Sequence, residues 1–142
     1  MASNREANLY VLGALNVAFG VVFLLVCGGI VLIWAAEVWA RRPIHVPPLF
    51  WIIMQSYHIA GIVLALVLII AGFGLMRNSL WGWWLSVFYA VTTTTLHVAV
   101  FQYRCRYETE LFAFAVEHTI AVIYPLFLLL MLLTDRLKAW TK

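Results

Sequence analysis

The spacing of the charged residues constrains this chain more than any other feature. No charged residue occurs between Glu6 and Glu37, and three later runs carry a single charge among them, at Glu117. A helix that rises about 1.5 Å per residue crosses the roughly 30 Å hydrocarbon core of a bilayer in about 20 apolar residues. The spacing therefore predicts four membrane-spanning helices, at about 9–36, 49–76, 80–103 and 111–134.

The connections between these runs are short, which favours helices that alternate in direction. We therefore predict an all-α integral membrane protein with four transmembrane helices in an up-down-up-down antiparallel bundle. Hydrophobic residues make up 65% of the 142 residues and charged residues 11%, so residues 1–142 are expected to form a single membrane domain. No basic run that would bind nucleic acid is present.

The distribution of basic residues gives a weak indication of orientation. Under the predicted topology Arg5, Arg77, Arg136, Lys138 and Lys142 lie on the side of the termini, and Arg41, Arg42, Arg104 and Arg106 lie on the other side. Positive charge is retained on the cytoplasmic side. The small excess favours cytoplasmic termini, and we expect the protein in a bacterial inner membrane.

Three intramembrane histidines are predicted to share one depth. Counting about 1.5 Å per residue from the nearest end of each run places His58 roughly 10 Å deep, His97 about 9 Å and His118 about 12 Å. Glu117 falls at that level, and so does the Gly28-Gly29 pair of the first run. Ionisable groups inside a membrane are candidates for function because an unpaired one is costly.

Polar or small residues recur at helical spacing above and below this level. One stripe in the second run contains Gln55, His58 and Ala65, and one in the third contains Ser86, Ala90, Thr93 and His97. Residues three, four or seven apart lie on one face of a helix. Small and polar faces suit contacts between transmembrane helices, so both stripes are predicted to face the bundle interior.

Four interpretations of the histidine level remain open. The first is haem b, with His58 and His118 as axial ligands and Gly28 and Gly29 leaving room for the macrocycle. The second is a metal ion bound by His58, His97, His118 and Glu117. The third is a proton path or quinone pocket that uses Glu117 and a neighbouring histidine. In the fourth, these groups only form hydrogen bonds between helices.

The absence of sequence for a soluble domain favours a small subunit or accessory protein of a larger membrane complex. Its expected partners are the lipid bilayer and other membrane subunits, or further copies of the chain. Ala60, Ala71 and Gly74 are expected to meet helices of those partners. The alternative is an independent protein that binds haem or a metal ion, or that handles protons or quinone. No nucleotide-binding glycine motif or serine nucleophile motif is present.

Overall fold

The computed structural model describes residues 2–40, 48–105 and 121–134. Three long helices lie in these ranges: α1 (Ala2–Trp39), α2 (Pro48–Met76) and α3 (Leu80–Arg104). A fourth, shorter apolar helix spans Ala121–Thr134, and no strand occurs in the described ranges. The three long helices are long and apolar enough to cross a membrane.

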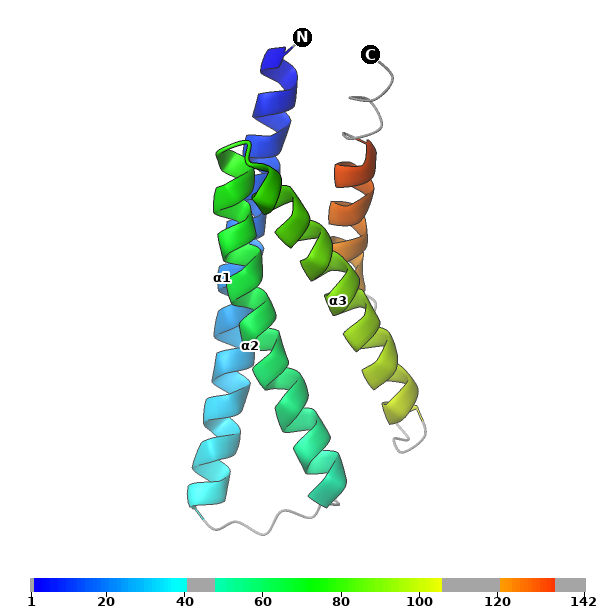
Figure 1. The fold of residues 1–142 in the computed structure, drawn as a ribbon. Coiled ribbons are helices and arrows are strands. Elements are labelled where there is room, and N and C mark those ends of the chain that lie inside the picture. Colours follow the sequence, from blue (N-terminus) through cyan, green and yellow to red (C-terminus); the bar gives the residue numbers. More distant parts are fainter. Residues whose placement is uncertain (1, 41–47, 106–120, 135–142) are drawn as a thin grey trace.

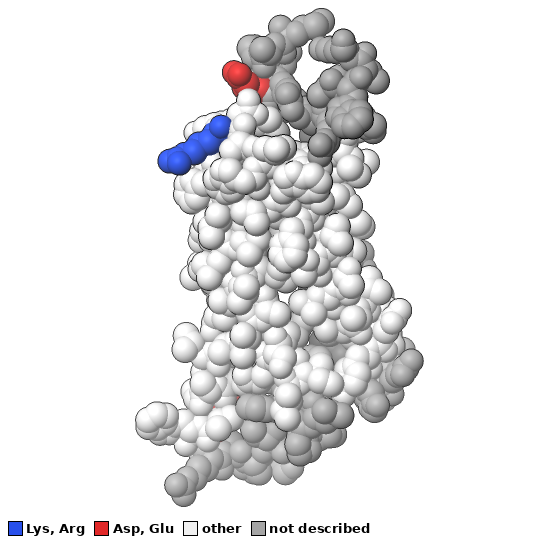
Figure 2. All heavy atoms as spheres, viewed as in Figure 1, with Lys and Arg blue, Asp and Glu red and all other residues white. Residues whose placement is uncertain are grey.

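The helices alternate in direction, as the short connections predict (Figure 1). The start of α1, the turn at 77–79 and the end of the fourth helix lie together, and we call this the termini end. The end of α1, the start of α2 and the end of α3 lie at the other end, which we call the loop end. Figure 2 shows a broad uncharged band between the two ends on the face in view. The all-helical antiparallel membrane bundle is therefore confirmed.

The helix boundaries agree closely with the spacing of charges. α2 and α3 match the predicted 49–76 and 80–103 to within one residue at each end. α1 extends beyond the predicted 9–36 in both directions. The helix Ala121–Thr134 falls within the predicted span of 111–134, and residues 111–120 and those after 134 lie outside the described residues.

A tight turn at 77–79 joins α2 to α3. Asn78 adopts a positive φ of 52°, a conformation that asparagine tolerates better than most residues. The Asn78 amide donates to Leu75 O (2.8 Å) and the Ser79 amide to Gly74 O (3.0 Å). These two bonds form a Schellman motif, which ends α2. The Ser79 side chain also caps α3 by accepting a bond from the Gly82 amide.

Glycines bring α2 and α3 into backbone contact beside this turn. A Cβ atom added to Gly74 would lie 2.6 Å from Gly82 Cα and 2.7 Å from the Trp81 ring. Gly74 and Ala71 are buried inside the chain. The expectation that Ala71 and Gly74 would meet partner subunits is therefore wrong, because α1 and α3 of the same chain already surround α2 on that side. Ala60 is half-buried.

Small residues at a spacing of seven line the contact between α1 and α2. A Cβ atom on Gly13 would lie 2.6 Å from Gly72 O, and one on Gly20 would lie 2.6 Å from Ile69 Cγ1. Seven residues further along α1, Cys27 packs its sulfur against Gly61. A seven-residue period keeps one seam of a helix facing its partner over several turns. This seam fixes the antiparallel register of the two helices.

The same seam widens towards the loop end. Its next position after Cys27 is Trp34, whose ring lies 5.8 Å from the His58 ring. The seam residues of α1 therefore grow from glycine through cysteine to tryptophan along the helix. Larger side chains hold helix axes further apart, and α1 and α2 separate towards the loop end (Figure 1).

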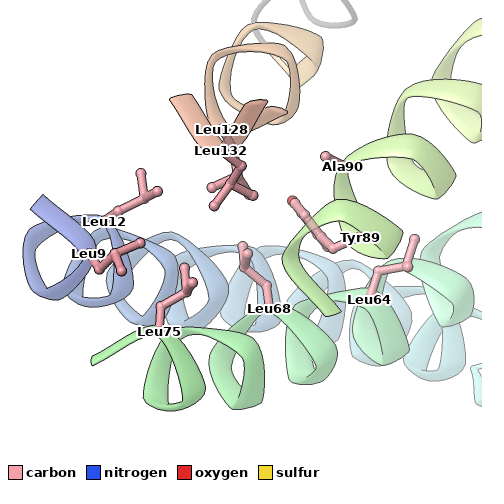
Figure 3. Close-up of a cluster of buried hydrophobic side chains, with 9 residues drawn as sticks. All are labelled: Leu9, Leu12, Leu64, Leu68, Leu75, Tyr89, Ala90, Leu128 and Leu132. Carbon is pink, nitrogen blue, oxygen red and sulfur yellow. The ribbon is translucent and has the colours of Figure 1, made fainter. Parts of the chain in front are cut away.

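A leucine-rich core fills the termini half of the bundle. Leucines from α1, α2 and the fourth helix point towards one another there (Figure 3). Seven leucines of this core are at most 8% exposed, and the five nearest the termini end are Leu9, Leu12, Leu75, Leu128 and Leu132. We call these five residues the leucine plug. It makes the interior apolar at the termini end, and a hollow of about 350 Å³ between α1 and the fourth helix is lined partly by Leu9, Leu12 and Leu132.

Candidate functional site

The polar stripe predicted on α3 lies in the bundle interior. Ser86 is 0% exposed, Ala90 1%, Thr93 2% and His97 4%. Neighbours on other faces of the same helix, such as Val91 and Val98, are half exposed. The predicted burial of this stripe is therefore confirmed, and it supplies most of the polar groups from which a site could be built.

Near the termini-end part of the stripe, Asn16 joins three helices. Its amide nitrogen donates to Ser86 Oγ at 3.1 Å, and its amide oxygen accepts a hydrogen bond from the Tyr124 hydroxyl. The Ser86 hydroxyl donates in turn to Gly82 O at 2.8 Å. The Tyr124 ring stacks on Phe19, with centroids 4.0 Å apart. These bonds connect α1, α3 and the fourth helix through groups that would be costly to bury alone.

Near the loop end, four ring side chains from three helices form a second group, which we call the aromatic cluster: Trp34, Tyr57, His58 and His97. The Tyr57 ring lies edge-on to both histidines, with centroid distances of 5.2 Å to His58 and 5.5 Å to His97. The Tyr57 hydroxyl lies 2.9 Å from His97 Nδ1, within hydrogen-bonding distance. Two of the predicted site histidines therefore contact one tyrosine.

Hydrogen bonding fixes the tautomer of His58. Its Nδ1 lies 2.7 Å from the carbonyl oxygen of Met54, one turn earlier in α2. A carbonyl oxygen only accepts hydrogen bonds, so Nδ1 carries a proton, and whenever the ring is neutral its lone pair is on Nε2. Histidines that bind metals commonly donate their other ring nitrogen to a backbone carbonyl in this way. The same bond also occurs in histidines with a purely structural role.

The other predicted ligands are only partly covered by the described residues. His118 and Glu117 lie outside them. Within the described ranges no group of three or more His, Cys, Asp or Glu side chains is positioned to hold a metal ion. The haem and metal interpretations, and the role of His58, His97, His118 and Glu117 in them, therefore remain predictions.

Gly28 and Gly29 do not face α2. A Cβ atom added to either would meet no described residue within 4 Å. Cys27 points at Gly61 of α2, and each further residue turns about 100° around the helix, so the two glycines point progressively away from that contact. Their predicted place beside a haem gains no contact from the described residues.

Sequence reasoning missed Trp34 and Tyr57. A signal for Trp34 was present, because it continues the seven-residue series of Gly13, Gly20 and Cys27. Tyr57 gave no such signal, since its position beside His97 depends on how α2 and α3 cross. Asn16 stands out in the sequence as an amide in an apolar run, but the sequence does not show that Ser86 and Tyr124 are its hydrogen-bond partners.

Comparisons with known proteins provide no further assignment. No protein-family model, curated protein or solved structure matches the chain.

Proposed function

We propose that this chain is a small subunit or accessory protein of a larger membrane assembly. The observation that carries the proposal is a pair of glycines on a side of α1 that no described residue covers. Gly28 and Gly29 are the two described glycines at which an added Cβ would meet nothing within 4 Å. Glycine lowers helix stability by about 1 kcal/mol relative to alanine, and here no contact within the described chain compensates for it.

The surroundings of this glycine pair also suit a helix–helix contact. Leu25 and Leu32 are 70% and 71% exposed and lie one turn before and after it, on the same side of the helix. Only 11% of the most apolar stretch of α1 is buried, against 44% for α2 and 33% for α3. Small residues between bulky ones let another helix approach closely, which lipid chains do not require.

Substitution of both glycines tests the proposal. We expect Gly28→Leu with Gly29→Leu to leave the chain folded, because no described residue lies where the new Cβ atoms would go, but to release it from its assembly because the new side chains keep the partner helix away. Native gels of mild-detergent extracts measure the assembly, and circular dichroism measures the helix content.

Val11→Leu provides the control, since Val11 is 58% exposed in the other half of α1. The control is expected to migrate as wild type. If the double variant also migrates as wild type, this face of α1 is covered by lipid and the proposal is wrong. For location we propose a bacterial inner membrane with cytoplasmic termini, on the basis of the basic residues.

The tautomer of His58 favours a second candidate, a cofactor-binding bundle. Its Nε2 lone pair is the atom that would bind haem iron or another metal ion. Imidazole suits Zn, Cu and Fe. In this candidate the Tyr57 contact orients His97, and His118 and Glu117 complete the set.

Absorption spectra and elemental analysis of the purified protein decide this candidate. If haem b is bound, His58→Ala and His118→Ala are each expected to abolish the Soret band, while His97→Ala only shifts it, because two axial ligands suffice. If a metal ion is bound, all three variants are expected to lower its occupancy. A colourless and metal-free wild-type protein would contradict both forms.

A further inference from the structure

The hollow of about 350 Å³ lies at the termini end, between the start of α1 and the end of the fourth helix. Its lining residues fall within 8–12 of α1 and 130–134 of the fourth helix. At about 1.5 Å per residue, the lining extends about 6 Å along each helix. The hollow is independent of the proposed contact at Gly28 and Gly29, which lie in the other half of α1.

The hollow has an apolar floor and a polar rim. Leu9, Leu12 and Leu132 form the floor, are at most 6% exposed and belong to the leucine plug (Figure 3). The lining residues nearest the termini end, Asn8 and Thr134, are polar and exposed. The Thr134 hydroxyl donates back to its own helix, at 2.6 Å to Leu130 O. The rim therefore offers a ligand the amide donors of Asn8.

The rim lies at the height of the membrane–water interface. Gly13 of α1 contacts Gly72 of α2, and the two helices are antiparallel. Asn8 lies five residues beyond Gly13, and Arg77 lies five residues beyond Gly72, so both are at about the same height. Arg77 is exposed, and the nearby Trp81 is 48% exposed. Exposed arginine and tryptophan side chains are typical of the headgroup region.

A lipid fits this hollow better than water or another helix does. The volume would hold about ten water molecules, but each needs two to four polar partners, and only Asn8 and Thr134 are polar in the lining. A cube of this volume has an edge of about 7 Å, whereas a helix with side chains is about 10–12 Å wide. A lipid supplies hydrocarbon for the floor, which would lose dispersion contacts if left empty, and a polar group for the rim.

The charge of the termini end favours an anionic lipid. Under the predicted topology this end carries five basic residues and two acidic ones, Glu6 and Asp135, whereas the loop end carries four basic residues and three acidic ones. Arg5 lies one helical turn before Asn8 in α1. A basic residue near a membrane surface strengthens binding of anionic lipid about fivefold.

We propose that the hollow binds one anionic phospholipid of the surrounding leaflet. The glycerol region and the start of one acyl chain lie on the leucine floor, and the phosphate accepts a hydrogen bond from the Asn8 amide. The rest of the chain continues over Leu130 and Leu126, which are 63% and 49% exposed on one face of the fourth helix. The lipid fills the space between the start of α1 and the end of the fourth helix.

Native mass spectrometry of the full chain tests the proposal. Protein released from nanodiscs of equal parts phosphatidylglycerol and phosphatidylcholine is expected to retain one phosphatidylglycerol and little phosphatidylcholine. Met131→Trp puts an indole into the hollow and is expected to lower the retained fraction at least tenfold. Leu133→Trp is the matched control, because Met131 and Leu133 are 39% and 45% exposed on the same helix and Leu133 lies outside the lining. It is expected to retain the lipid as wild type does.

Three results of this experiment would overturn the proposal: retention of both lipids alike, retention of neither, or wild-type retention by Met131→Trp. Asn8→Leu provides a second variant at an exposed position, where folding does not depend on the side chain. It is expected to weaken phosphatidylglycerol retention about tenfold, because it removes a hydrogen bond to a charged phosphate. Unchanged retention by Asn8→Leu would also contradict the proposal.

Photo-crosslinking identifies the occupant directly. Leu130→p-benzoylphenylalanine places a photoreactive ring at the edge of the hollow, and in the same nanodiscs we expect it to attach mainly to phosphatidylglycerol. The same residue introduced at Leu133 is expected to attach to both lipids in proportion to their amounts. Attachment at position 130 to residues 135–142 of the same chain, or to a second copy, would overturn the proposal and show that protein fills the hollow.

Discussion

Single polar side chains specify how the apolar helices of this bundle meet. Leucine and valine pack against lipid as well as against protein, so they give little preference for one arrangement. Asn16 is different, because it is 0% exposed and bonds to Ser86 of α3 and to Tyr124 of the fourth helix. Any rotation of α1 about its axis would leave these groups unpaired in an apolar medium.

A double-mutant cycle measures how strongly Asn16 and Tyr124 are coupled. We expect Asn16→Leu and Tyr124→Phe to destabilise the protein by about 1–3 kcal/mol each, because each leaves its partner's polar group buried without a bond. The double variant removes both groups and is expected to cost clearly less than the sum. Unfolding in mixed detergent micelles provides the free energies. Costs that add to within about 0.5 kcal/mol would show that the two residues act independently.

At the scale of the helix, the sequence predicted where α2 and α3 begin and end far better than which way their side chains point around the helix axis. The boundaries of α2 and α3 follow from charge spacing, because the thickness of the hydrocarbon core sets how long an uncharged helical run must be to cross it. The α3 stripe was predicted to be buried because its residues share a face whichever helix they meet. Both inferences need only one helix at a time.

Direction around a helix axis depends on the neighbouring helices and was predicted less well. Counting residues puts Gly28 and Gly29 at the depth of the histidines, yet they point away from α2 while the adjacent Cys27 points at it. Gly74 shows the same limit, since it packs on Gly82 of its own chain and not on a partner. The seam of Gly13, Gly20 and Cys27 is visible in the sequence, but nothing there says that α2 packs against it.

For the whole molecule, the small seam residues of α1 and the α2–α3 turn both bring helices close together at the termini end. Gly13 lies against Gly72, and Gly74 lies against Gly82, so both helix pairs are closest at the termini end. Towards the loop end the seam residues enlarge and the helices spread (Figure 1). The leucine plug lies in the tight half and the aromatic cluster in the wide half. The bundle is therefore asymmetric across the membrane, and its orientation decides which side the aromatic cluster lies nearer to.

Cysteine labelling in intact cells tests the topology and the orientation together. The native Cys105 is exposed at the end of α3, and Glu6 is exposed near the start of α1. Three spans separate them, so a membrane-impermeant maleimide should reach only one of Cys105 and a cysteine placed by Glu6→Cys in a Cys105→Ser background. Removal of a glutamate scarcely affects orientation, which follows lysine and arginine. Cys27 is buried and is expected to stay unlabelled.

With cytoplasmic termini Cys105 reacts from outside, and the residue 6 cysteine reacts only after lysis. The reverse pattern would overturn the proposed orientation but keep the fold, and labelling of both from outside in one uniform population would contradict three complete crossings.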